Sequence, residues 1–289
     1  MIIRAKQWLH ISCCCVAIEA INRSELTTAS QVSSQWSNFP RFSKDAIELV
    51  WSDEFDVDGA PDPESWGYDI GGWGWGNNEL QYHTDRRENS FVKDGFLHIV
   101  VRNEQYETNA YTSARLLTKG KREFQYGRFE ARIRIPRQSS GLWPAFWMLG
   151  VNFESVGWPG CGEIDIMEWV YNLNGNGFPQ TRGNATRSSA HGPGYSGGQS
   201  EHADVYGITD GFHVYALEWT DTELRFFLDG RSFATLTPDP WVFNHPFFII
   251  LNVAVGGWGG TVDPSMVFPM EMTVDYIRVY QLRTSYLCK

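Results

Sequence analysis

Apolar and charged residues alternate without a break over residues 129–135 (Phe-Glu-Ala-Arg-Ile-Arg-Ile), and Pro136 follows directly. Because successive side chains of a β-strand point to opposite faces, this pattern predicts a strand with one buried and one charged face. Residues 247–255 are apolar at every position except Asn252, which is typical of a strand buried on both faces. Both patterns favour β-sheet.

Further short strands are expected where apolar runs are separated by turn residues. They cover residues 96–101, the hairpin 212–219 and 224–228, and residues 273–281. The sequence contains no convincing long amphipathic helix and no internal repeat. It therefore predicts an all-β fold, an antiparallel β-sandwich. Residues 171–211 are rich in Gly, Asn and Ser, and we expect an irregular loop there that forms a rim of the site.

The first 45 residues differ in composition from the rest. Arg4 and Lys6 precede a short apolar run that ends in the small-x-small sequence Cys15-Val16-Ala17, which predicts a secretory signal peptide over residues 1–20. Residues 21–45 are polar and predict a flexible leader. We expect the main domain over residues 46–283, a tail over 284–289, and a secreted, extracellular protein.

Composition limits the kinds of partner. The formal net charge is −10 and no basic stripe is present, so we expect no nucleic-acid partner. No apolar run reaches the roughly 18 residues of a membrane-spanning helix, so we expect no membrane partner. Aromatic residues make up 15 % of the chain, including 13 Trp, which suits a neutral partner bound by stacking and hydrogen bonds, such as a polysaccharide. We expect a monomer.

Cysteines give little structural information. The contiguous Cys13, Cys14 and Cys15 lie in the predicted signal peptide, which leaves Cys161 and Cys288. The sequence leaves open whether these two pair or remain separate thiols.

Three carboxylates, Glu163, Asp165 and Glu168, are interleaved with Ile and Met over residues 163–168. On a regular strand Glu163 and Asp165 share one face, while Glu168 lies on the other. One extra residue accommodated as a β-bulge near Met167 restores the parity and brings Glu168 beside the other two acids. Two carboxyl groups about 5–5.5 Å apart are what glycoside hydrolysis with retention requires.

Tryptophans flank this strand in the sequence. Trp143 and Trp147 precede it and Trp158 lies on its approach, so flat apolar rings for sugars accompany acids for the bond. The alternative is a structural strand whose acids face solvent. For Trp147, packing in the core and a place in the site both remain open.

These residues resemble the bulged active-site signature of glycoside hydrolase family 16, in its endo-β-1,3-glucanase (laminarinase) branch. Further segments carry the resemblance in family order: residues 49–55, 76–82, 111–116, 124–128, 143–150, 191–195 and 274–280. The resemblance implies a curved jelly roll with a substrate cleft on its concave face. It also implies Glu163 as nucleophile, Glu168 as general acid/base, and Asp165 as the residue that orients Glu163.

Several other residues are candidates for binding substrate. Asn78, Arg115 and His191 match family positions that line the cleft. Trp258 lies in a Gly-rich loop (256–260) that lacks the Asn and Pro often present in the family, and Asn252 is polar within an apolar strand. The alternatives are a turn for Asn78, a surface ion pair for Arg115, and a structural role for His191. Trp73 and Trp75 either form a distal sugar platform or pack against the body.

No cofactor is expected for catalysis. The family often carries a structural calcium, for which Asp275 matches the side-chain ligand and Gly95 a possible carbonyl donor. The alternative is that Asp275 is an ordinary exposed strand residue.

The resemblance implies a secreted retaining endo-β-1,3-glucanase with a laminarin-like β-glucan as partner. Cleavage of mixed β-1,3-1,4-glucan, transglycosylation, and non-catalytic glucan recognition on the same fold remain alternatives. The presence of all three acids favours the enzyme.

Overall fold

The computed structural model describes residues 45–136, 140–170, 185–197, 201–206 and 211–283. The predicted signal peptide, the leader up to residue 44 and the C-terminal tail lie outside these ranges. Helical structure in the described part is short, with α2 (Phe153–Val156) and the 3-10 turn η2 (Gly257–Gly259). Within the same residues, no helix is long and apolar enough to cross a membrane.

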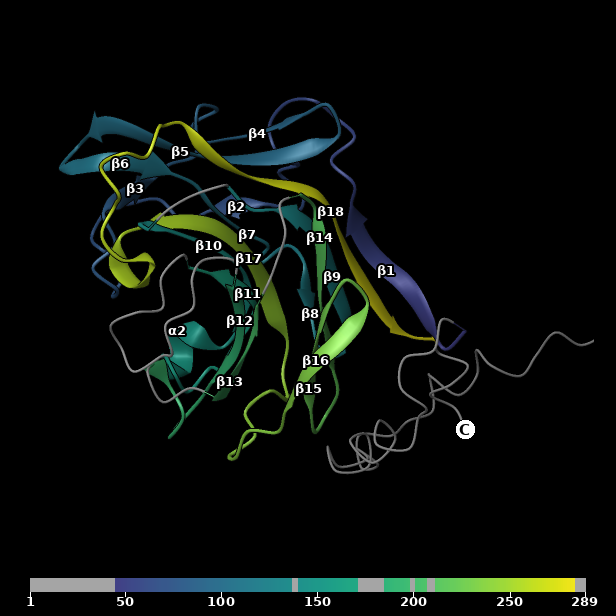
Figure 1. Cartoon of the computed structure of the whole chain (residues 1–289). Coiled ribbons are helices and arrows are strands. Elements are labelled where there is room, and N and C mark those ends of the chain that lie inside the picture. The colour runs from purple at the N-terminus through teal and green to yellow at the C-terminus, as the bar shows by residue number, and fades with distance from the viewer. Residues whose placement is uncertain (1–44, 137–139, 171–184, 198–200, 207–210, 284–289) are drawn as a thin grey trace, which may run out of the picture. The chain divides into compact units, whose positions relative to one another are not determined.

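The strands form two sheets that pack face to face, a curved antiparallel β-sandwich of the jelly-roll type (Figure 1). The ten-stranded sheet has the order β16 (Arg231–Leu236), β15 (Leu224–Leu228), β14 (His213–Trp219), β9 (Gly127–Arg134), β18 (Met270–Leu282), β5 (Phe96–Tyr106), β6 (Asn109–Ser113) and β3 (Gln81–His83), with β1 (Ile47–Asp53) beside β18 and β4 (Ser90–Lys93) beside β5. The eight-stranded sheet has the order β13 (Glu201–Tyr206), β12 (Ala185–His191), β11 (Glu163–Trp169), β10 (Leu142–Gly150), β17 (Phe247–Val255), β7 (Arg115–Leu117) and β2 (Gly67–Tyr68), with β8 (Glu123–Phe124) beside β17. All pairs are antiparallel except β3 with β6.

Strand β17 has both faces covered, as its apolar sequence predicts. Phe247 packs against Trp219 of β14 with ring centroids 5.1 Å apart, so this residue and its alternate neighbours face the ten-stranded sheet. The other set, which includes Phe248 and Asn252, points to the opposite, concave face of the eight-stranded sheet. Every residue of β17 is nevertheless buried. The alternation predicted for residues 129–135 is likewise confirmed in β9.

The prediction of an irregular loop over residues 171–211 is wrong for two segments, because β12 and β13 form strands at the edge of the eight-stranded sheet. Residues 171–184, 198–200 and 207–210 lie outside the described part. The polar sequence of β12 concealed the strand. Its hydroxyl groups bond to carbonyls of β11: Ser188 Oγ donates to Ile166 at 2.7 Å and Thr186 Oγ1 to Glu168 at 3.0 Å. These residues are therefore buried although they are polar.

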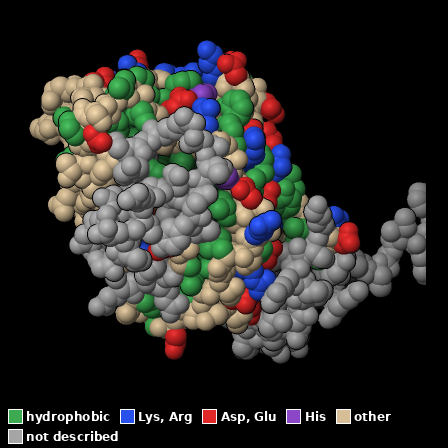
Figure 2. Space-filling model, viewed as in Figure 1, with side chains coloured by type: hydrophobic (Ala, Val, Ile, Leu, Met, Phe, Trp, Pro, Cys, Tyr) green, Lys and Arg blue, Asp and Glu red, His purple; other side chains and the backbone are tan. Residues whose placement is uncertain are grey.

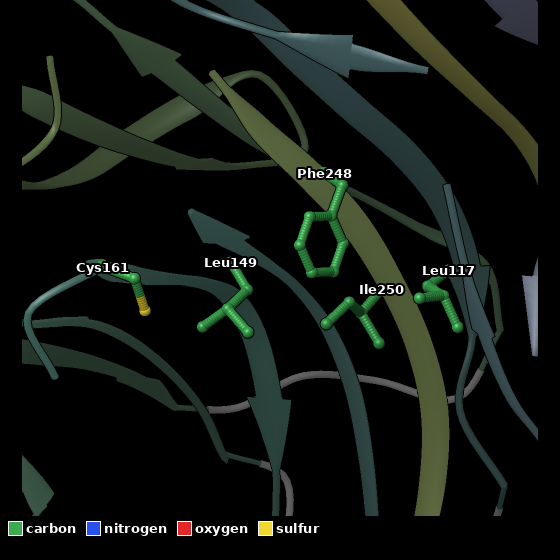
Figure 3. Close-up of a cluster of buried hydrophobic side chains, with 5 residues drawn as sticks. All are labelled: Leu117, Leu149, Cys161, Phe248 and Ile250. Atoms are coloured by element: carbon green, nitrogen blue, oxygen red, sulfur yellow. The ribbon is translucent and has the colours of Figure 1, made fainter. Parts of the chain in front are cut away.

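An apolar cluster occupies one end of the concave face (Figure 3). It consists of Leu117 from β7, Leu149 from β10, Phe248 and Ile250 from β17, and Cys161 from the loop before β11. The Cys161 thiol is buried and forms no disulfide, in agreement with separate thiols; Cys288 lies outside the described part. Leu149 is the β-ladder partner of Glu163, so this cluster removes water from beside the first acid of β11.

Candidate active site

The bulge predicted near Met167 is present. Against β10, Trp147 pairs with Asp165 and Phe146 with Met167, which leaves Ile166 without a partner. Against β12, Asp165 pairs with Ser189 and Glu168 with Arg187, again one residue short. The extra residue inverts the parity of the strand beyond it, so Glu163, Asp165 and Glu168 all lie on the concave face.

Glu163 lies at the more open end of this row. Trp158 donates its indole N–H to Glu163 Oε2 at 3.1 Å, and His191 Nε2 lies 3.7 Å from Oε1. About one fifth of the Glu163 side chain is exposed (18 %), compared with 4 % for Asp165. Trp158 itself is 46 % exposed, so the indole that binds this carboxylate also offers a free surface to a ligand.

Glu168 lies deeper and is held by two donors. Trp143 donates its indole N–H to Oε1 at 3.0 Å, and Ser189 donates its hydroxyl to Oε2 at 3.3 Å. Two tryptophans therefore bind the two outer acids, one each. Both were predicted as stacking residues, and the sequence did not indicate that they would also orient the carboxyl groups.

Asp165 connects the two acids with His191. The N–H of Gly197 donates to His191 Nδ1 at 3.1 Å, which in the neutral ring places the proton on Nε2. This nitrogen lies 2.9 Å from Asp165 Oδ2, so the two groups are in contact, although their geometry is not that of a hydrogen bond. Asp165 is also hydrogen-bonded to Glu163, as expected from the resemblance. His191 is only 9 % exposed, and its imidazole lies against the acid cluster rather than in solvent.

Burial dominates the electrostatics of the cluster. Removal from water disfavours the charged form and raises the pKa of Glu163, Asp165 and Glu168, each to about 8. The negative charge of Asp165 raises the pKa of Glu163 and Glu168 further. At neutral pH the cluster consequently retains protons that isolated carboxyl groups would have lost.

Arg115 lies half-buried between two indoles. Its guanidinium stands 4.8 Å from the ring of Trp75 and 4.8 Å from that of Trp147. It also pairs at 3.0 Å with the partly exposed Asp69, so the ion pair considered as an alternative exists. Trp147 packs on the apolar cluster and also faces Arg115, so its core role is confirmed and its role as a substrate ligand stays a prediction.

Asn252 has its hydrogen-bond partner on the same face. Its Oδ1 accepts the indole N–H of Trp147 at 2.8 Å, and the residue is 7 % exposed. The polar residue within β17 thus fixes the ring that bounds the site.

Trp258 lies edge-on to Trp143, with centroids 5.6 Å apart, and the guanidinium of Arg187 stands 5.3 Å from its ring. Arg187 forms a bidentate pair with Asp204 at 2.7 and 2.9 Å. Because Arg187 is also the β-ladder partner of Glu168, the side chains of Arg187, Asp204 and Trp258 enclose Glu168.

Asn78 adopts the turn considered as its alternative, with φ of 57°. It also lines an open pocket of about 470 Å³ together with Leu80, Tyr111 and the loop that carries Trp258. Its prediction as a substrate ligand therefore remains a prediction.

Sequence reasoning did not identify Ser189, Arg187, Asp69 and Asp204. Each acts through a partner on another strand. The signal that would reveal Ser189, Arg187 and Asp204 is the pairing register of β11, β12 and β13, and for Asp69 it is the pairing of β2 with β7, rather than any local motif. A register with Glu168 opposite Arg187 identifies Arg187 at once.

Two places were tested as metal sites. In the described part, Glu163, Asp165 and His191 bring ligand atoms within 4.8 Å of one another, but these are the acid cluster itself. The carboxylate of Asp275, predicted as a calcium ligand beside Gly95, accepts a hydrogen bond from Arg132. A guanidinium in that position disfavours a calcium ion.

Comparisons with known proteins agree with this geometry. Residues 73–278 match the model of the glycosyl hydrolases family 16. The chain is 47 % identical over 251 residues to the beta-glucanase of Rhodothermus marinus, which covers 81 % of this chain and 85 % of that protein. The catalytic domain of an endo-1,3-beta-glucanase (laminarinase) from Thermotoga petrophila RKU-1 superposes with a TM-score of 0.75 at 44 % identity, over 82 % of this chain and 99 % of that one. A structure named as a non-specific endo-beta-1,3(4)-glucanase superposes with a TM-score of 0.74 at 36 % identity, over 85 % and 94 %.

Proposed function

Because the chain belongs to glycosyl hydrolase family 16, we propose that it is a retaining endo-β-1,3-glucanase that cleaves internal bonds of a laminarin-like β-glucan. The observation that carries the proposal is the bulge of β11, which puts three buried carboxyl groups on one face beside the indole N–H groups of Trp143 and Trp158.

The two outer acids differ in exposure. We assign the more exposed Glu163 as the nucleophile that attacks the anomeric carbon, as the family resemblance implies, and the deeper Glu168 as the proton donor to the leaving oxygen. Burial raises the pKa of both to about 8, and ionisation of one acid disfavours ionisation of its neighbour, so the cluster can hold Glu163 ionised while Glu168 keeps its proton. Glu168 then takes a proton from the water that cleaves the glycosyl ester on Glu163, and two inversions give net retention.

Asp165 and His191 serve the nucleophile. The hydrogen bond between Asp165 and Glu163 fixes the orientation of the attacking carboxylate. His191, whose Nε2 lies 2.9 Å from Asp165 Oδ2, supports Asp165 from the other side. No cofactor takes part in this chemistry.

Substrate hydrolysis with a matched variant tests the proposal. Purified protein and Glu163→Gln are incubated with laminarin, mixed-linkage glucan and cellulose while reducing ends and product sizes are followed. Early release of mixed oligosaccharides from laminarin, absent in the variant, is the expected result. Binding of laminarin without cleavage would instead identify a glucan-recognition protein.

Mixed-linkage cleavage is the second candidate. The similarity to a non-specific endo-beta-1,3(4)-glucanase favours it, and the assay on mixed-linkage glucan decides it. Interception of the glycosyl-enzyme by a sugar instead of water would appear in the same assay as products longer than the added oligosaccharide.

Secretion and a monomeric state complete the proposal. Secretion rests on the pattern over residues 1–20 alone, and N-terminal sequencing of protein recovered from culture medium tests it. Light scattering of the purified protein tests the monomer.

A structural calcium at Asp275 and Gly95 has little support, because Arg132 already neutralises that carboxylate. We expect the thermal unfolding midpoint to stay the same when calcium is replaced by a chelator. A fall in the midpoint that added calcium reverses would show that a site exists.

A further inference from the structure

Trp73 is a large apolar side chain held in solvent. Among the Trp and Phe residues that the structure describes, Trp73 is the most exposed, with 68 % of its surface accessible. Single exposed apolar residues are common and need no explanation on their own. The loop around Trp73, however, is built to hold its ring in place.

Glycine makes room for this ring. A Cβ at Gly71 would stand 1.8 Å from Cζ3 of Trp73, so the indole lies directly on the backbone of Gly71. The ring of Trp75 packs beside it, with centroids 4.0 Å apart. Gly71 and Trp75 therefore support the indole, while most of the Trp73 surface stays exposed.

Hydrogen bonds make the loop rigid despite its glycines. Gly71 exchanges two backbone bonds with His83, at 3.0 and 2.8 Å, and accepts the Trp75 indole N–H at 3.2 Å. Asn109 Nδ2 donates to the Gly72 carbonyl at 3.0 Å. A ring fixed before binding loses little conformational freedom when a ligand covers it, which is the arrangement of a preorganised binding surface.

The ring also continues the substrate cleft. From Glu168, the β-ladder runs through Ala145 and Asn252 to Arg115 on the concave face, in steps of about 4.8 Å from strand to strand. From Arg115 the stack continues outward through Trp75 to Trp73. The row thus leads from the general acid/base across the sheet to the exposed indole.

We propose that Trp73 is a distal platform on which a glucosyl residue of the bound β-glucan stacks, several sugars from the scissile bond on the Arg115 side of the cleft. The occupant follows from continuity with the acid cluster, because a chain bound across Ala145 and Asn252 and extended past Arg115 reaches this ring. Pyranose rings present flat C–H surfaces that suit an indole face. The inference rests on the proposed function and adds a binding position to it.

Chain-length dependence provides the test. Hydrolysis of β-1,3-gluco-oligosaccharides of increasing length and of laminarin is measured for the wild type, Trp73→Ala, Trp73→Tyr and the control Phe227→Ala. Phe227 is an aromatic residue of β15 in the other sheet, where it covers Arg128. Trp73→Ala is expected to lower kcat/KM on laminarin about three- to tenfold, mainly through KM, as the loss of one aromatic contact predicts.

The loss should grow with chain length and appear only above a threshold, Trp73→Tyr should recover most of it, and Phe227→Ala should match the wild type throughout. Equal kinetics for Trp73→Ala and the wild type on every length would overturn the platform, and so would an equal loss on every length.

Laminarin binding separates this inference from the proposed function. Titration of Glu163→Gln with laminarin is compared with titration of the double variant Glu163→Gln/Trp73→Ala. If the wild type fails to hydrolyse laminarin but Glu163→Gln binds it, weaker binding by the double variant still supports the platform. Unchanged binding, or none by either protein, rejects it.

Discussion

Carboxylates occupy the outward faces of both sheets, and they have opposite surroundings. On the ten-stranded sheet they alternate with arginines: Arg278 forms a bidentate pair with Glu54, and Arg128 contacts both Glu130 and Glu218. Blue and red side chains lie next to one another over that sheet in Figure 2. On the concave face, three acids stand together, and the nearby arginines, Arg115 and Arg187, are already paired with Asp69 and Asp204.

The two arrangements move the carboxyl pKa values in opposite directions. The hydrogen bond from Arg278 lowers the pKa of Glu54, and the bond to His98 lowers that of Glu271. Burial raises the pKa of Glu163, Asp165 and Glu168. Residue type therefore does not decide what an acid does on this fold. The partners across the strands decide it: paired acids stabilise the sheet, whereas crowded, buried acids store protons for catalysis.

The largest difference between the faces should appear in activity. Glu168→Gln is expected to reduce hydrolysis of laminarin by about 10²- to 10⁴-fold, because it removes the proton donor to the leaving oxygen. Glu271→Gln, the matched change on the ten-stranded sheet, should stay within a factor of two or so of the wild type, since surface ion pairs contribute little. Reducing-end assays measure both, and circular dichroism checks the folding. Comparable losses in the two variants would remove the distinction between the faces.

Stability should also respond oppositely to pH. The pKa of Glu163 is raised from 4.5 to about 8, so the folded protein holds a proton that the unfolded chain has lost between these values. The favourable contribution is complete below pH 4.5 and is lost as the pH rises to about 8. Glu163→Gln mimics the protonated form, so it should unfold like the wild type at low pH and be more stable above pH 8, by on the order of 2 kcal/mol.

For Glu271 the sign is reversed. Its pKa is lowered by the bond to His98, so its contribution is present above its ordinary pKa and is lost as the pH falls. Glu271→Gln should therefore be slightly less stable than the wild type at neutral pH and equal to it in acid. Denaturant melts across the pH range measure both variants, and parallel pH profiles for the two would contradict the comparison.

A histidine contacts an acid on each face, which allows a third comparison. His191 Nε2 lies 2.9 Å from Asp165, and His98 Nδ1 lies 3.1 Å from Glu271. The charge of His191 lowers the pKa of Glu163, so His191→Asn should raise that pKa and move the acidic limb of the kcat/KM profile to higher pH. At pH values on that limb, we expect a loss of about tenfold, which corresponds to a displacement of the limb by about one pH unit.

His98→Asn should leave the profile unchanged. A fixed acidic limb in His191→Asn, with activity lost equally at every pH, would show that His191 supports only the local structure.

The smallest effect is expected at Arg187. Its charge lowers the pKa of Glu168, so Arg187→Gln should raise that pKa and extend the alkaline limb of the kcat/KM profile to higher pH. The shift should be smaller than that in His191→Asn, because Asp204 neutralises most of the charge. Arg132→Gln, which breaks the pair with Asp275 on the other sheet, is the control and should leave the limb in place. A downward shift in Arg187→Gln would contradict this role.

The successful sequence-based predictions rested on the alternation of apolar and polar residues and on counting which positions of a strand share a face. The charged alternation of β9 and the apolar run of β17 predicted both strands, and counting positions from Glu163 to Glu168 predicted the bulge. These succeed because burial acts on each position separately, so its trace remains in the local sequence.

The sequence could not predict what depends on pairing. Strand β12 looks like a loop because its Ser and Thr hydroxyls satisfy carbonyls of β11, which only the neighbouring strand reveals. Asn252 was recognised as a polar residue in need of a partner, but Trp147 lies more than a hundred positions away in the chain. The position of Arg187 beside Glu168 depends in the same way on the register between β11 and β12.

The bulge at Ile166 sets the direction of every side chain that follows it in β11. If the same residues formed a regular strand, Met167 and Glu168 would exchange directions: the carboxyl group would point between the sheets, among apolar side chains, and the thioether would face the cleft. Deletion of Ile166 would have the opposite outcome, because it removes the unpaired residue together with the bulge and leaves Glu163, Asp165 and Glu168 at alternate positions of a regular strand, all on the concave face. The active site is therefore compatible with the bulge and its extra residue, or with the loss of both, but not with the loss of one alone.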